Sequence, residues 1–137
     1  MGRVFFNTRI NIDTKSCTGT DTYVMRAEDS GKTFLVSGGT QAITLLPLAD
    51  LVEGWNCKFI TTASPSGDKT IGAGSTIIHG ASANGSGDAG GVSDGTAKTN
   101  VLIKAASQAG NFVDIVCDGN AYYVSGTQGQ NSATLFS

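Results

Sequence analysis

Hydrophobic residues occur along this chain in short runs, most of them broken by polar residues. Residues 8–13 alternate strictly, with Ile10 and Ile12 on the apolar side, and a period of two is typical of a strand with one buried face. Similar short runs predict strands at 22–27, 33–37, 42–46, 55–61, 75–79, 99–105, 111–117 and 121–125. Residues 47–54 begin with Pro and end with Gly, which favours either a helix of one or two turns or a 3₁₀ turn.

The pattern as a whole predicts an all-β fold, a compact β-sandwich or jelly-roll-like barrel. A length of 137 residues suits one domain, which we divide into an extended N-terminal arm (1–20) and a single β-domain (21–137). Residues 80–98 are almost entirely small and polar and predict a long, exposed Gly-rich loop. Asp118-Gly119 is the strongest hairpin signal. The expected core is Phe34, Val36, Ile43, Leu45, Trp55, Phe59, Ile77, Val101, Ile103, Val113, Ile115 and Val124.

Composition excludes several classes of function. The net charge is −2 and the pI about 5.1, whereas a protein that binds nucleic acid by neutralising phosphates is basic. No apolar run approaches the roughly 18 residues that would span a bilayer, and the N-terminus lacks the apolar stretch of a secretion signal. Cys57 and Cys117 lie in apolar runs and are expected in the core, while exposure of Cys17 is left open. We expect no disulfide and a reducing site of synthesis.

The residues that could carry chemistry do not form a catalytic or metal-binding motif. His79 is the single histidine and fits a strand end better than a general base or a metal site. Asp88 and Asp94 lie among glycines but without the repeated spacing of a calcium loop. Asp114 is expected on the outer face of a strand and Asp118 in a turn, not as a pair of catalytic carboxylates. We therefore predict no catalytic residue, no metal and no cofactor.

The N-terminal arm is one candidate contact surface. Phe5, Phe6, Ile10 and Ile12 are unfavourable in a free tail, so the arm is expected either to lie on a sister subunit or another protein, or to be a first strand of its own sheet.

Tyr122 and Tyr123 are the candidates for an exposed aromatic contact. Because adjacent strand residues point to opposite faces, one of the two rings should lie outside the core. Such a ring could contact a protein or a sugar.

Four segments together resemble a small β-domain found in virion proteins of tailed bacteriophages. They are AEDSGKTFLV (27–36), AITLLP (42–47), GWNCKFI (54–60) and GNFVDIVCDGNAYYV (110–124). Domains of this kind occur in capsid decoration (cement) proteins and in tail-fibre modules, and the resemblance covers roughly residues 21–126.

The resemblance implies a structural role and not an enzyme. The expected protein is made in the host cytoplasm, sits on the outer capsid surface of the virion and stabilises contacts between major capsid subunits. The resemblance also implies a homotrimer. The alternative is a tail-fibre or baseplate module that binds a host-surface glycan through Tyr122 or Tyr123.

Overall fold

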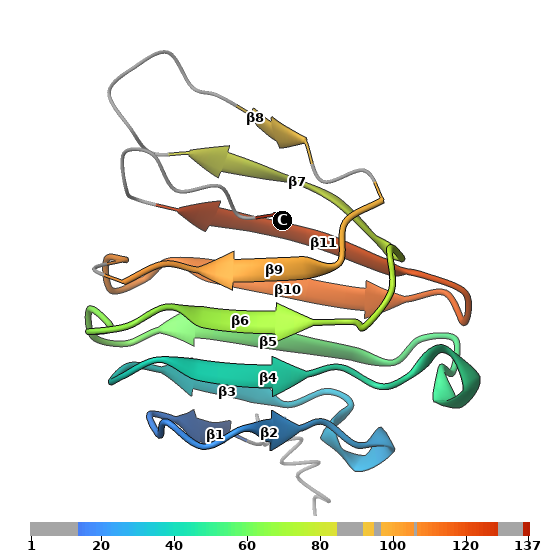
Figure 1. Ribbon diagram of the computed structural model, residues 1–137, viewed down its shortest axis with the longest axis horizontal. Helices are drawn as coiled ribbons and strands as arrows, with labels where there is room; N and C mark the ends of the chain where they lie inside the picture. The colour runs from blue at the N-terminus through green and yellow to red at the C-terminus, as the bar shows by residue number, and fades with distance from the viewer. Residues whose placement is uncertain (1–13, 85–91, 95–96, 106, 129–135) are drawn as a thin grey trace, which may run out of the picture.

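The computed structural model describes residues 14–84, 92–94, 97–105, 107–128 and 136–137. They form two stacked β-sheets and two single-turn 3₁₀ helices, η1 (Ala27–Asp29) and η2 (Leu48–Asp50) (Figure 1). The larger sheet contains, in spatial order, β1 (Thr14–Cys17), β3 (Thr33–Val36), β5 (Asn56–Thr61), β10 (Phe112–Cys117), β11 (Tyr122–Gln128), β7 (Ile78–Asn84) and β8 (Val92–Asp94). The smaller sheet contains β2 (Tyr23–Val24), β4 (Gln41–Thr44), β6 (Lys69–Gly72) and β9 (Asn100–Ile103).

The chain winds between the two sheets from β1 to β6. Odd-numbered strands join the seven-stranded sheet and even-numbered strands the four-stranded sheet, so that β1, β3 and β5 are parallel, as are β2, β4 and β6. This is possible because each parallel crossover passes through the opposite sheet. Strands β10 and β11 then form an antiparallel hairpin beside β5, and β9 pairs antiparallel with β6. The all-β prediction is confirmed, but the jelly-roll form is not, since a jelly roll is built from antiparallel strands.

The core lies between the sheets and follows the predicted alternation. On β10, for example, Val113, Ile115 and Cys117 are buried while the intervening residues face outward. The predicted core residues are all buried except Ile77, which is half-buried and packs against the core while its neighbour Ile78 is fully buried. The rings of Phe34 and Phe59 stack at 5.0 Å in the middle of this core.

All three cysteines are buried free thiols. Burial of Cys57 and Cys117 was expected. Cys17 is also buried, 3% exposed, because β1 forms the edge of the seven-stranded sheet with the Cys17 side chain facing inward. Burial raises the pKa of both Cys17 and Cys57, so neither thiol is a ready nucleophile at neutral pH.

Strands occur in three places where the sequence does not predict them. Strand β1 occupies part of the predicted arm and pairs with β3 of the same chain. Strand β6 was missed because one of its two inward positions is the charged residue Lys69 and only the other, Ile71, is apolar. Lys69 is fully buried, and its Nζ donates to the Gly19 carbonyl at 3.2 Å and to Gln41 Oε1 at 3.5 Å.

The predicted exposed loop at 80–98 is wrong at two places. Strand β7 continues through Asn84, and Val92–Asp94 form β8, which pairs with it. Gly80 shows why small residues are needed here: a Cβ on Gly80 would lie 2.0 Å from the Val124 carbonyl oxygen of the neighbouring strand β11. The same small side chains leave no hydrophobic alternation from which a strand could be recognised. Residues 85–91 and 95–96 lie outside the described residues.

Candidate functional site

The side of the seven-stranded sheet that faces away from the smaller sheet, here called the outer face, carries exposed and half-buried apolar and aromatic side chains. One row crosses β3, β5 and β10, where Leu35 lies opposite Ile60 and Ile60 opposite Phe112. A second row crosses β10 and β11, where Val116 lies opposite Tyr123. Val116 is 50% and Tyr123 48% exposed. The outer face is therefore more apolar than is usual for a sheet face that is exposed only to water.

Two contacts orient the Tyr123 side chain, one with the face of its ring and one with its hydroxyl. The His79 ring, directly opposite on β7, stacks on it with centroids 5.9 Å apart and planes at 29°. The Tyr123 hydroxyl donates to Asp118 Oδ2 at 3.1 Å, and this hydrogen bond raises the pKa of the hydroxyl. Because the ring is already ordered, little side-chain entropy would be lost when a ligand or partner covers it.

Asp118 is positioned by the β10–β11 turn, as its sequence predicts. Its Oδ1 accepts the backbone N–H groups of Asn120 and Ala121, both at 2.8 Å, and these bonds lower the pKa of the carboxyl. The following residue, Gly119, has a φ of +90°, which glycine adopts without strain. The hairpin thereby fixes the acceptor that orients Tyr123.

An ion pair separates the two apolar rows of the outer face. Lys58 Nζ lies 3.5 Å from Asp114 Oδ1, and both side chains are roughly two-fifths exposed. Lys58 Nζ also lies 5.1 Å from the centroid of the Phe112 ring. Asp114 is on the outer face of β10 as predicted. An exposed pair of this kind adds little stability, but it adds a directional polar contact to an otherwise apolar surface.

Two shallow hollows meet at Asp114 and Val116. One, of about 260 Å³, is lined by His79, Tyr123 and Ser125 as well as these two residues. The other, of about 450 Å³, extends past Asn56 toward β3. Both are open and lined by side chains that can make van der Waals contacts and hydrogen bonds. The arrangement can bind a ligand or a protein partner through these contacts.

Tyr122, the other predicted aromatic contact, does not reach the surface. It is fully buried, its hydroxyl donates to the Leu46 carbonyl at 2.9 Å, and its ring meets Trp55 edge-on at 6.0 Å. The rule that one of the adjacent tyrosines faces outward is confirmed for Tyr123, and the prediction of Tyr122 as an exposed contact is wrong. Burial also raises the pKa of Tyr122 well above its usual value.

The other predicted contact residues, Phe5, Phe6, Ile10 and Ile12, lie outside the described residues. The apolar row of Leu35, Ile60 and Phe112 was not predicted. Each of these three residues adjoins an apolar core residue in sequence, so the strands are apolar on both faces and periodicity alone cannot show which residues point outward.

A separate cluster around Asp29 serves the fold. The Asp29 carboxylate, 1% exposed, accepts hydrogen bonds from Lys32 Nζ (2.8 Å), the Tyr23 hydroxyl (2.8 Å) and the backbone N–H of Arg26 (2.9 Å). Burial alone would raise the pKa of this carboxyl, but the three hydrogen bonds and the charge of Lys32 hold the pKa below its usual value. The cluster ties η1 to β2 and to the start of β3.

No group of three or more metal-binding side chains occurs within the described ranges, and of the pair Asp88 and Asp94 the first lies outside them. None of the helices described is long and apolar enough to cross a membrane. No protein-family model matches the chain, and no curated protein matches its sequence.

Proposed function

We propose that this protein is a structural component of a bacteriophage virion, a capsid decoration (cement) protein. It binds the outer surface of the capsid and stabilises contacts between neighbouring major capsid subunits. The observation that carries the proposal is the outer face, where Val116 and Tyr123 are each about half exposed on a rigid sheet. The resemblance to virion β-domains, quoted above in four segments, supports the same role.

The chemistry of the outer face suits a protein partner. Aromatic residues are enriched in protein interfaces because they bury large areas at little cost in entropy. The two apolar rows supply that area, and the pair Lys58–Asp114 between them supplies polar contacts that can set the register. A capsid presents the same site many times, so a weak contact at each site is strengthened when the decoration protein is itself an oligomer.

We further propose a homotrimer in which the N-terminal arm contacts a sister subunit or the capsid. The sheet edges support self-association: β1 lies at one edge of the larger sheet and β2 at one edge of the smaller sheet. An edge strand presents backbone N–H and C=O groups with which a neighbouring chain can pair.

A tail-fibre or baseplate module that binds a host glycan is the second candidate, favoured by one specific observation. The ordered Tyr123 ring borders a hollow of about 260 Å³ together with the Asp114 carboxylate and the Ser125 hydroxyl. A flat aromatic ring beside hydrogen-bonding groups is suited to a sugar, which presents both C–H and O–H groups.

Two valine substitutions test which sheet face makes the contact. Val116→Asp places a charge on the outer face, while Val24→Asp places the same charge at a valine of similar exposure (57%) on the smaller sheet. We expect Val116→Asp to lose co-sedimentation with capsids that lack the protein, and Val24→Asp to retain it. Equal binding by both variants would contradict the proposal, and binding to host glycans but not to capsids would favour the second candidate.

A further inference from the structure

Ser107 presents a buried polar atom that no described residue satisfies. The residue is 1% exposed and lies in the connection between β9 and β10. Within the described part of the chain, the Ser107 hydroxyl oxygen has no hydrogen-bond partner. An unpartnered buried hydroxyl costs free energy, so native proteins provide a partner for nearly all of them.

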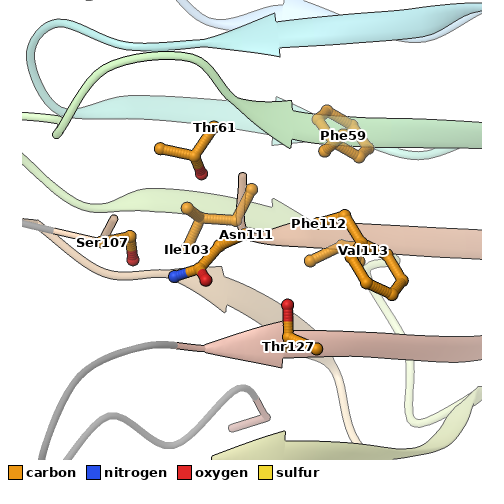
Figure 2. A pocket seen from close by; sticks show the side chains of 8 residues that line it. All are labelled: Phe59, Thr61, Ile103, Ser107, Asn111, Phe112, Val113 and Thr127. Atoms are coloured by element: carbon orange, nitrogen blue, oxygen red, sulfur yellow. The ribbon is translucent and has the colours of Figure 1, made fainter. Parts of the chain in front are cut away.

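Ser107 lines a small, partly open cavity at one end of the core. Figure 2 shows side chains of β5, β9, β10 and β11 around it, together with Ser107. Its volume is about 10 Å³, which is close to the space that the centre of one water molecule requires. The cavity is too small for any organic ligand. Its walls are formed by Phe59, Thr61, Ile103, Ser107, Asn111, Phe112, Val113 and Thr127.

The polar groups of this wall are suited to hold a water molecule. Thr61, Asn111 and Thr127 line the cavity beside Ser107, and a buried water typically makes about three hydrogen bonds. The neighbouring backbone groups already pair with one another: the Thr61 N–H donates to the Asn111 carbonyl at 2.8 Å, and the Ser107 N–H to the Lys104 carbonyl at 3.1 Å. The hydroxyl groups of Ser107, Thr61 and Thr127 are therefore the side-chain groups considered as partners of a ligand in the cavity.

We propose that this cavity binds one water molecule as a structural ligand, with the Ser107 hydroxyl as its principal partner. The water hydrogen-bonds to Ser107 and to polar side chains from β5 and β11. It thereby fastens the β9–β10 connection to the core. This inference is independent of the proposed virion role, because it concerns the interior of the domain.

The wild-type protein gives the direct test. In a crystal structure at high resolution, we expect an ordered density peak within hydrogen-bond distance of Ser107 Oγ. In solution, cross-relaxation between water and the amide protons of Ser107 and Asn111 should show a long-lived bound water. A cavity without density, combined with no such cross-relaxation, would overturn the proposal.

The variant Ser107→Ala adds a second test, in which the direction of the change in Tm shows whether water is bound. If water is bound, the variant loses a hydrogen bond and its Tm falls by about 2–5 °C. If the hydroxyl is truly unsatisfied, its removal relieves a desolvation penalty, so an unchanged or higher Tm would contradict the proposal. Ser125→Ala, at an exposed serine of β11, is the matched control and should leave the Tm unchanged.

Discussion

The adjacent tyrosines Tyr122 and Tyr123 allow the assignment of the two sheet faces to be tested with one chemical change. Tyr122→Phe keeps the ring that meets Trp55 but removes the hydroxyl that donates to the Leu46 carbonyl at 2.9 Å. Both partners are buried, so the carbonyl is left without this donor and cannot recover it from water. Losing one partner of a buried hydrogen bond costs about 1–3 kcal/mol.

Tyr123→Phe is the internal control, because it removes a hydroxyl whose partner Asp118 is exposed to water. Urea unfolding should show a lower midpoint at unchanged slope for Tyr122→Phe, and the wild-type midpoint for Tyr123→Phe. If the two variants behave alike, or if Tyr123→Phe is the more damaging, the assignment of inner and outer faces is wrong.

Three further perturbations test the interior. Trp55→Ala should cost about 3–5 kcal/mol in the free energy of unfolding, because the ring is 3% exposed and its N–H donates to the Arg26 carbonyl; a near-neutral effect in denaturant titration would contradict its burial. Asp29 has a lowered pKa in the folded state, so its carboxylate stabilises the fold above about pH 4 and loses that effect as the pH falls through the folded-state value. Urea midpoints from pH 7 to 2 should therefore fall less steeply in Asp29→Asn than in the wild type, and equal slopes would refute this. Lys69→Met should leave the Tm unchanged or higher, since it removes a buried amine whose pKa is lowered by burial; a fall of several degrees would show that the hydrogen bonds of the amine dominate.

The strands that could be predicted from the sequence are those with large side chains on the inner face. Runs predicted at 55–61 and 111–117 correspond to β5 (Asn56–Thr61) and β10 (Phe112–Cys117). Strand β6 could not be predicted because a buried lysine occupies an inward position, and the end of β7 could not because its residues are small. In these strands, hydrogen bonds to the backbones of neighbouring strands hold the segment in the sheet, although its side chains show no hydrophobic alternation.

The alternation of successive strands between the two sheets could not be predicted from the sequence either. Parallel pairing of β1, β3 and β5 depends on contacts between segments about 20 residues or more apart, for which periodicity contains no information. The candidate site was predictable only in part for the same reason. Adjacency alone shows that one of Tyr122 and Tyr123 faces outward, but the choice of Tyr123 follows from the register of β11 against β10.

The number of copies of this chain in purified virions tests the proposed decoration role most directly. Quantitative mass spectrometry against the major capsid protein provides this number. The account predicts hundreds of copies per particle, because a decoration protein occupies sites repeated over the whole shell. A count of only a few copies, of the size found for tail components, or no copies at all, would contradict it.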